Sequence, residues 1–245
     1  MLKINSLSKT YGKKIIFDKF DLSVKQGQFI ALMGANGIGK TTLLNLLAGL
    51  ISPDSGDISV ANRSNRSRDV SYMMQNHHDG LFPWFKVWEN IALPLKFKGI
   101  PEKKRYLAVI ELMSRYSINL PLSCYPYQLS GGQKQLTLLL QSIISKPSLI
   151  LMDEPFSALD LITSKKIQTK LVEMWQAEKP TIIYISHRIE DAIYLANRVV
   201  VMSADPARII LDLENSLPYP RETGVIGNKE FSKLYKHLER VIANL

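Results

Sequence analysis

The chain has 245 residues and a formal net charge of +9, since Lys and Arg number 31 and Asp and Glu 22. This length suits one large domain or two small ones, and a hydrophobic fraction of 46% excludes a disordered chain. No apolar run approaches the roughly 20 residues that cross a bilayer, and the single Cys excludes a disulfide framework or a multi-cysteine zinc site. The first residues lack the apolar stretch of a signal peptide, so we expect an intracellular protein. Its basic charge suits nucleic acid, an anionic membrane surface or a phosphorylated ligand.

The first half of the chain predicts short strands, one helix and then a helical region. Strands are predicted, in chain order, at residues 2–5, 15–24, 29–33, 57–60 and 70–74. A helix is predicted at 39–49, between the third and fourth of these strands, and ends at Gly49. Helical periodicity then covers much of 88–116, with interruptions at Pro94 and at residues 99–101.

The second half alternates helices with strands. The predicted elements are a helix at 130–145, a strand at 149–152, a helix at 162–176, a strand at 181–186, a helix at 189–196, and strands at 199–202 and 208–213. This order predicts a parallel α/β core with antiparallel strands at the start. The tail predicts a separate helix whose apolar stripe packs on the domain's own core or on a partner; the stripe is Phe231, Leu234, Tyr235, Leu238, Val241, Ile242 and Leu245.

One segment matches the phosphate-binding pattern G-x-x-x-x-G-K-[ST] without a mismatch, between a predicted strand and a predicted helix. Its glycines allow backbone N–H groups to surround phosphates, and the helix N-terminus adds its positive dipole. Lys40 is predicted to reach the β- and γ-phosphates, and the Thr41 hydroxyl to bind Mg²⁺. Kinases, GTPases and motor ATPases share this pattern, so alone it predicts only nucleotide binding. The predicted binding residues are Gly34, Ala35, Asn36, Gly37, Ile38, Gly39, Lys40, Thr41 and Thr42.

Two carboxylates follow the apolar run at 149–152. Asp153 stands at the C-terminal end of the predicted strand, where α/β sheets bind ligands, so we expect it in the Mg²⁺ shell. Glu154 is placed to polarise a water for attack on the γ-phosphate, as a general base. Taken alone, such an acidic pair more often begins a turn or a helix. The phosphate-binding segment in the same chain is the reason to interpret the pair as a metal ligand and a general base.

Residues 129–133 read Leu-Ser-Gly-Gly-Gln and form a second candidate anion site. Ser130 is predicted to cap a helix, and Gly131 and Gly132 leave the N–H groups of its first turn accessible; Gln133 completes the segment. The alternative is a plain capped helix with a flexible entry. One phosphate-binding loop cannot use both sites on one face, which suggests two chains facing each other.

With these motifs in this order, the chain resembles the ATP-binding-cassette (ABC) ATPases, the nucleotide-binding subunits of ABC transporters, from residue 2 to about 213. The resemblance implies that Tyr11 stacks on adenine, that Gln75 contacts Mg²⁺ and the attacking water, and that His187 lies near the γ-phosphate. Residues 129–133 match the family signature, and 157–160 match its D-loop. The implied cofactors are ATP and Mg²⁺; the implied catalytic residues are Glu154, His187 and Gln75, the metal ligands Thr41, Gln75 and Asp153, and the signature contacts Ser130, Gly131, Gly132 and Gln133.

The same resemblance implies the fold and the assembly. The expected fold class is α/β, a P-loop ATPase core with a parallel sheet, an antiparallel β subdomain and an inserted α-helical signature subdomain. Residues 1–214 form the cassette, with the helical subdomain at about 88–145, and 215–245 form a C-terminal helical tail. Two copies are expected to sandwich head to tail, so that each ATP lies between the phosphate-binding loop of one chain and the signature of the other. ATP closes the dimer and hydrolysis reopens it.

An aromatic stretch at residues 80–91 is the candidate contact with a membrane permease. Its aromatic side chains pack a helical subdomain or line an apolar groove for a partner helix; in ABC transporters this region receives the permease's coupling helix. The runs at 198–209 and 217–221 resemble the nitrate/sulfonate/taurine group of bacterial importers, which includes relatives for thiamine precursors. The resemblance thus implies a peripheral subunit on the cytoplasmic face of the inner membrane, driving uptake of a small solute with a permease and, indirectly, a solute-binding protein.

The competing hypothesis is a soluble ABC ATPase that acts on nucleic acid. The charge of +9 is the one feature that favours it. No array of basic and aromatic residues supports it, and such relatives usually carry paired cassettes or long insertions. We therefore expect no nucleic-acid partner. Leu136, Gln141 and Arg188 depart from the family's usual residues, without removing a phosphate ligand or the base.

Overall fold

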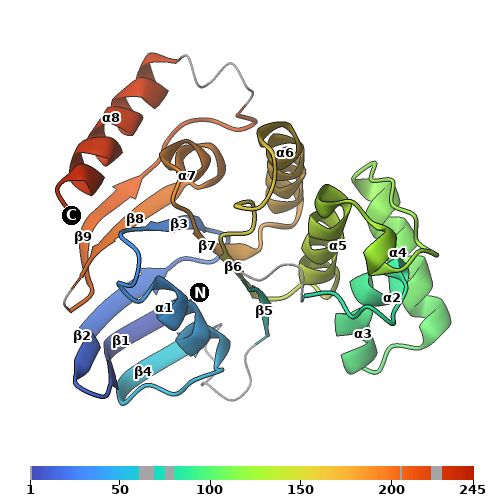
Figure 1. Cartoon of the computed structure of the whole chain (residues 1–245), viewed down its shortest axis with the longest axis horizontal. Coiled ribbons are helices and arrows are strands. Elements are labelled where there is room, and N and C mark those ends of the chain that lie inside the picture. Colours follow the sequence, from blue (N-terminus) through green and yellow to red (C-terminus); the bar gives the residue numbers. More distant parts are fainter. Residues whose placement is uncertain (1, 61–68, 75–79, 205, 222–227) are drawn as a thin grey trace.

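The computed structural model describes residues 2–60, 69–74, 80–204, 206–221 and 228–245. These residues form two sheets, with helices packed on them (Figure 1). The smaller sheet is antiparallel in the order β2-β1-β4, from β1 (Leu2–Tyr11), β2 (Lys14–Val24) and β4 (Ser55–Val60). Leu2, Ile4 and Leu7 are buried while residues between them are exposed, as expected for a sheet with one face on a core.

The larger sheet carries the predicted site residues. Its order is β5-β6-β7-β3-β8-β9, with β5 (Val70–Met73), β6 (Leu149–Asp153), β7 (Thr181–Ile185), β3 (Phe29–Met33), β8 (Arg198–Ser203) and β9 (Arg208–Glu214). The first five strands are parallel, and every residue of β3, β6 and β7 is buried, which explains their unbroken apolar runs. Besides the predicted antiparallel strands at the start, the last strand β9 runs antiparallel to β8, which the sequence did not predict.

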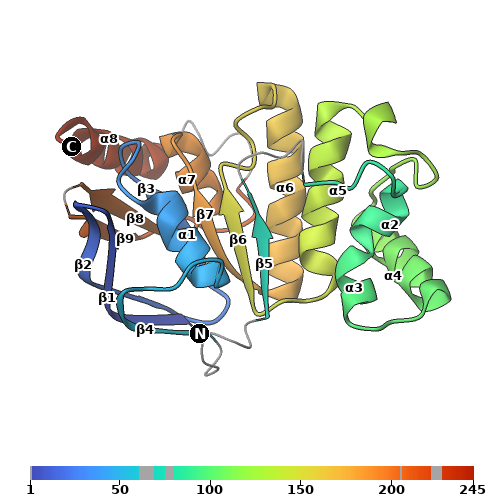
Figure 2. The same cartoon turned by 60° about the horizontal axis from the view of Figure 1, so that its bottom comes forward.

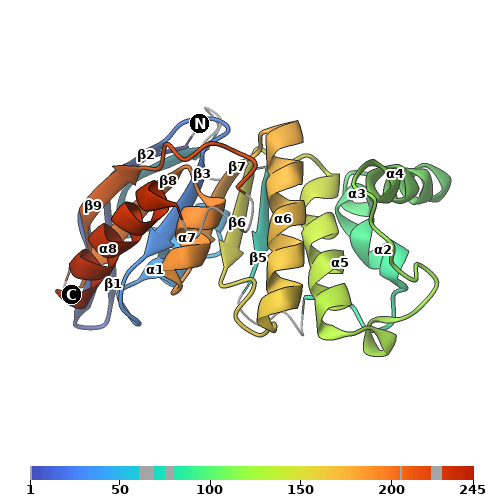
Figure 3. The same cartoon turned by 90° about the horizontal axis from the view of Figure 1, so that it is seen from above.

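Alternate side chains of the parallel strands enter two separate cores. Ile30 and Leu32 of β3 pack toward α1 (Lys40–Ala48) and the antiparallel sheet. Phe29, Ala31 and Met33 pack on the other face, against helices that cover it in Figure 3. These helices are α5 (Gly131–Ile144), α6 (Leu161–Glu178) and α7 (Ile189–Leu195). The sheet is thus fixed on both faces, and its strand ends are rigid supports for a site.

The helical region lies beside β5 and consists of short helices around α5 (Figure 1). Its helices are α2 (Val87–Ile91), α3 (Leu93–Phe97) and α4 (Glu102–Arg115). The first break falls at Ala92, so that Pro94 lies in the first turn of α3 rather than at the interruption, and the second falls at residues 98–101, as predicted to within one residue. A 3₁₀ turn at Pro126–Gln128 leads into α5. The buried Asn90 side chain accepts from the Phe82 N–H at 2.8 Å and donates to the Phe85 carbonyl at 3.0 Å, which fixes the aromatic loop.

The tail folds onto the larger sheet's core. Helix α8 (Lys229–Ala243) buries Phe231 and Leu238 in the same core as α7, and the other stripe residues through 242 are partly buried there. Of the two predicted alternatives, the stripe thus packs on the chain's own core, except for Leu245, which is 46% exposed. In the described ranges, no helix has the length and apolarity that crossing a membrane requires.

Candidate nucleotide-binding and catalytic site

The phosphate-binding loop connects the C-terminal end of β3 to α1. Gly34 and Gly39 have φ of 145° and 108°, and a Cβ on Gly34 would lie 2.5 Å from the Met202 carbonyl oxygen, so this turn requires glycine. Lys40 is only 6% exposed, and its Nζ donates to the carbonyl oxygens of Gly34 at 2.9 Å and Ala35 at 2.8 Å. Burial lowers the pKa of Lys40, and the nearby carboxylates of Glu154 and Asp153 oppose that shift. The two hydrogen bonds hold the Lys40 ammonium over the loop, where phosphate oxygens could replace the carbonyl oxygens as acceptors.

Asp153, the last residue of β6, meets the start of α1. Thr41 Oγ1 donates to Asp153 Oδ2 at 2.7 Å, so the two predicted Mg²⁺ ligands are in contact. Asp153 Oδ1 is buried and has no hydrogen-bond partner in the described part of the chain. Burial raises the pKa of Asp153, and the Thr41 hydrogen bond opposes that shift. A hard divalent cation fits this orphaned carboxylate oxygen and adjacent hydroxyl, because Mg²⁺ takes oxygen ligands.

We expect Asp153→Asn to stabilise the nucleotide-free protein by about 1 kcal/mol at pH 7, because it removes an incompletely solvated buried charge. The folded-state pKa is raised, so this penalty is fully present above that pKa and disappears as pH falls below the unfolded value. Urea unfolding without Mg²⁺ at pH 7 and at about pH 3.5, below the ordinary aspartate value of 3.8, should therefore show the advantage of the variant shrinking on acidification. A variant less stable than the wild type at pH 7 would contradict this origin of the shift.

Glu154 and His187 meet across the ends of β6 and β7. His187 Nε2 lies 2.6 Å from Glu154 Oε1, although the two residues are 33 positions apart. Glu154 has a φ of 49°, uncommon for a residue with a side chain, and directs its carboxylate toward the histidine from this turn. With Phe156, both line a small hollow of about 50 Å³. A carboxylate paired with an imidazole beside the phosphate-binding loop can accept and pass a proton.

Sequence reasoning overlooked Ser186, which fixes the histidine loop. Its Oγ donates to the Arg188 carbonyl at 3.0 Å and accepts from the Arg188 N–H at 3.1 Å. A serine directly after a β-branched strand and before a helix is the available signal for such a turn. The Arg188 side chain extends to Asp191, with Nε and Oδ2 3.7 Å apart.

The predicted signature segment forms a capped helix start. Ser130 Oγ accepts from the Gln133 N–H at 3.3 Å and Gln133 Oε1 accepts from the Ser130 N–H at 3.0 Å, a reciprocal capping box. A Cβ on Gly132 would lie 2.5 Å from Thr163 Cγ2, so glycine lets α5 begin close to α6. Figures 2 and 3 show the starts of α1 and α5 at the same end of the molecule, separated by β6, β5 and α6. The two candidate phosphate sites are thus not brought together within one chain.

Two further predicted contacts are Tyr11 and Gln75, and the structure describes only the first. Tyr11 ends β1 with its side chain 49% exposed, and Lys9 Nζ lies 5.6 Å from the ring centroid. An exposed ring at this position is free to stack on a base. Gln75 lies outside the described residues, so its predicted contacts with Mg²⁺ and water stay predictions.

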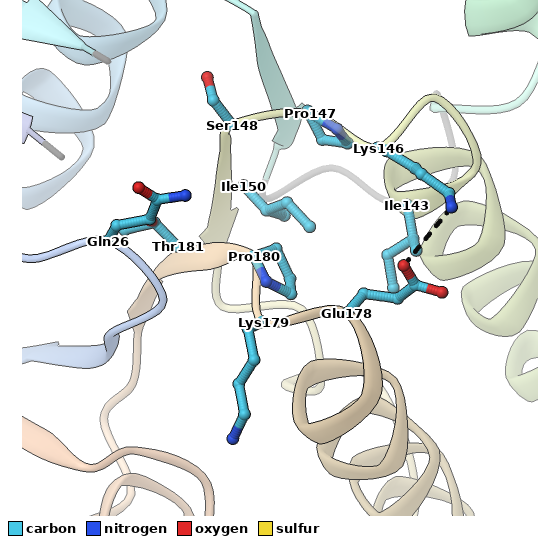
Figure 4. A pocket seen from close by; sticks show the side chains of 10 residues that line it. All are labelled: Gln26, Ile143, Lys146, Pro147, Ser148, Ile150, Glu178, Lys179, Pro180 and Thr181. Atoms are coloured by element: carbon cyan, nitrogen blue, oxygen red, sulfur yellow. Dashed lines mark ion pairs between the residues drawn. The ribbon is translucent and has the colours of Figure 1, made fainter. Parts of the chain in front are cut away.

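A cavity of about 550 Å³ lies away from these residues, at the opposite end of β6 and β7 (Figure 4). Its charged side chains do not converge on a ligand. Lys146 turns to Glu178, with Nζ and Oε2 3.6 Å apart, and Lys179 points away, with its Nζ 4.4 Å from the Trp175 ring centroid. This cavity is therefore separate from the candidate nucleotide site, which lies at the other end of these strands.

The sequence profile of the ABC transporter family matches residues 17–157, from the antiparallel sheet through the Asp153–Glu154 pair. The chain is also 34% identical to the aliphatic sulfonates import ATP-binding protein SsuB of Bacillus cereus, over 95% of this chain and 93% of that protein. The chain belongs to the ABC transporter family. A putative ATP-binding protein of Brucella abortus is 32% identical over 95% of this chain and 90% of that protein.

Solved structures agree with this membership in the ABC family. The ATP-binding cassette MJ0796, as a dimer bound to ADP and phosphate after hydrolysis, has a TM-score of 0.75, 26% identity, and coverage of 89% of this chain and 100% of its own. The protein cbiO1 of Clostridium perfringens, part of an ABC transporter complex, has a TM-score of 0.77, 25% identity, and coverage of 98% and 96%. The chain described here is an ATP-binding, ATP-hydrolysing ABC cassette with the α/β P-loop fold.

Proposed function

We propose that two copies of this chain enclose two ATP molecules head to tail and drive solute uptake through a membrane permease. One observation carries the dimer. Two phosphate sites face the same end of the molecule, yet β6, β5 and α6 separate them (Figure 2). A γ-phosphate held by the loop around Lys40 can meet a capped α5 start only if a second copy supplies it. The related cassette MJ0796, whose solved structure is dimeric, supports this arrangement.

Within each site we assign roles by contact. Lys40 and the loop N–H groups hold the β- and γ-phosphates, and Thr41 with Asp153 holds Mg²⁺. The cation would neutralise charge on the phosphate oxygens when bound. Glu154 orients the attacking water and takes its proton, and His187, 2.6 Å from that carboxylate, holds it in place and contacts the γ-phosphate. Tyr11 stacks on adenine, and Ser130 with its following glycines completes the phosphate shell from the second copy.

The surface that receives the permease is the aromatic patch of Phe82, Trp84 and Phe85. Two of these side chains are exposed, Phe82 by 39% and Trp84 by 65%. The rings of Phe82 and Trp84 lie 5.4 Å apart, and those of Phe82 and Phe85 5.7 Å apart, so they form one continuous apolar surface. Asn90 holds its loop rigid. An exposed, preformed apolar patch of this kind fits a partner helix.

The proposed solute is a small anion such as a sulfonate, delivered by a solute-binding protein. The Bacillus cereus relative, an aliphatic sulfonates import ATP-binding protein, supports this class. The cassette would then lie on the cytoplasmic face of the inner membrane as a peripheral subunit. The solute itself would be selected by the permease and the binding protein, so its identity is tested by the ligand that stimulates ATP hydrolysis in the reconstituted complex.

The permease surface can be tested separately from ATP chemistry. We expect Trp84→Ala with Phe82→Ala to prevent co-purification of a membrane-spanning subunit while the isolated chain keeps its ATPase rate, because both rings lie in the patch and outside the candidate nucleotide site. Tyr127→Ala removes a ring that is 72% exposed outside the patch and serves as the matched control. Undiminished co-purification of the permease with the double variant would reject this surface.

A further inference from the structure

Helix α7, which begins two residues after His187, is held at its far end by side chains from the tail. Asn215 Nδ2 donates to the carbonyl oxygens of Ile193 and Ala196, at 2.8 Å each. Tyr219 Oη donates to the carbonyl oxygen of Leu195 at 2.7 Å. The last carbonyls of a helix lack partners within the helix, so these tail side chains supply what α7 cannot supply itself.

Arg221 completes this arrangement from the same tail segment. It is 2% exposed, and its guanidinium donates to the carbonyl oxygens of Ile193, of Tyr194 at 3.2 Å and of Ala196 at 2.8 Å. Its Cζ also lies 3.9 Å from the Tyr219 ring centroid. Within the described ranges, no carboxylate forms an ion pair with Arg221, so its charge is compensated by backbone carbonyls and an aromatic face.

All four consecutive carbonyls from residue 193 to 196 therefore receive a tail donor. We name Asn215, Tyr219 and Arg221 the C-terminal clamp. Helix α7 has only seven residues, too few for a helix to persist in water without tertiary support. Helix α8 adds apolar packing on the same helix.

The histidine loop lies between two supports. On one side is β7, fixed by its neighbours in the parallel sheet. On the other is α7, linked to the loop through Arg188, whose backbone is bracketed by Ser186. If α7 unfolds or shifts, the loop that carries His187 is held only by β7. The imidazole can then move away from Glu154 and lose the 2.6 Å contact between Nε2 and Oε1.

We infer that the C-terminal clamp positions the catalytic loop: by fixing the end of α7, Arg221 and Tyr219 hold His187 against Glu154. They are positioning residues, because neither touches the nucleotide. The tail that follows the cassette thus acts on the position of the catalytic loop. This inference rests on the proposed role of His187.

The test compares kinetics in two backgrounds of the full chain. We expect Arg221→Met to lower kcat for ATP at least about tenfold with KM changed less than about threefold, since small displacements of a catalytic group cost rate rather than binding. In a His187→Ala background, single-turnover hydrolysis with labelled ATP should show no further loss from Arg221→Met. Tyr219→Phe deletes one hydrogen bond, keeps the ring, and should give the same pattern in weaker form even where Arg221→Met does not fold.

The matched control is Arg198→Met, which removes another largely buried arginine that pairs with Asp212 and does not contact α7. It should lower Tm without the selective loss of kcat.

Wild-type kcat in both Arg221→Met and Tyr219→Phe, with His187→Ala inactive, would overturn the clamp while leaving the proposed function intact. An equal loss in the His187→Ala background would overturn it as well, since the effect would then bypass the histidine. Wild-type kcat in His187→Ala would instead refute the proposed role of that residue.

Discussion

Replacing Lys40 with Ala is expected to lower ATPase kcat by about 10²- to 10³-fold and to weaken ATP binding at least tenfold. Each charge-assisted hydrogen bond to a phosphate contributes about 1.5–3 kcal/mol, and donors aimed at developing charge contribute more to the transition state than to binding. Lys40 is buried and already bonded to two loop carbonyls, so it is pre-positioned rather than recruited from solvent.

This loss should not come from unfolding. Burial lowers the pKa of Lys40, which means that the folded nucleotide-free protein disfavours its charge. Removing the ammonium should leave Tm near the wild-type value, while the stabilisation by ATP disappears. Lys25→Ala, at an exposed lysine, is the matched control and should behave as wild type in ATPase rate and in thermal shift with ATP. If Lys40→Ala hydrolyses ATP at the wild-type rate, the phosphate-binding assignment is wrong.

Glu154→Gln is expected to lower kcat by about 10³-fold while ATP binding stays within a few-fold of wild type, because the amide has the same shape but cannot accept a proton. Its side chain can still meet His187, which leaves the loop geometry in place. Steady-state phosphate release and equilibrium ATP binding, measured on the same preparation, separate the two effects.

The matched control for this loss of charge is Glu173→Gln, an exposed carboxylate of α6 that pairs with Lys170. It should keep the wild-type rate. A Glu154→Gln enzyme with more than about a tenth of the wild-type kcat would exclude Glu154 as the base, since general bases contribute about 10²- to 10⁴-fold.

The parallel core was predictable because its signals are local. The strand at Phe29–Met33 and the following glycines obey short-range constraints, apolar burial on two faces and a turn that excludes a Cβ. The phosphate-binding loop, the Asp153 ligand position and the Ser130 cap depend on the same kind of pattern, and the structure places each at the predicted element end. The breaks of the helical region at Ala92, just before the first turn of α3 with its Pro94, and at residues 98–101 are local in the same sense.

What could not be predicted depends on contacts distant in sequence. The antiparallel direction of β9 follows from a short return after β8, which an apolar pattern does not encode. The 2.6 Å pairing of Glu154 and His187, the turn made by Ser186, and the capping of α7 by Arg221 join segments that meet only in the fold. A single buried arginine produces no periodic pattern. The sequence therefore predicts the apolar stripe of the tail but not the hydrogen bonds from Arg221 to the end of α7.

The central claim, that each of two ATP molecules is bound between two copies of the chain, is tested most directly by the mass of the Glu154→Gln protein in solution. Light scattering should give about 56 kDa with ATP and Mg²⁺, twice the 27.8 kDa of one chain, and about 28 kDa with ADP. Adding Gly131→Asp, which places a carboxylate at the start of α5 where a Cβ has room, 3.8 Å from Leu159 Cδ2, should return the ATP-bound sample to the mass of one chain without preventing ATP binding. A Glu154→Gln protein that binds ATP yet remains at about 28 kDa, or a dimer indifferent to Gly131→Asp, would contradict the shared site.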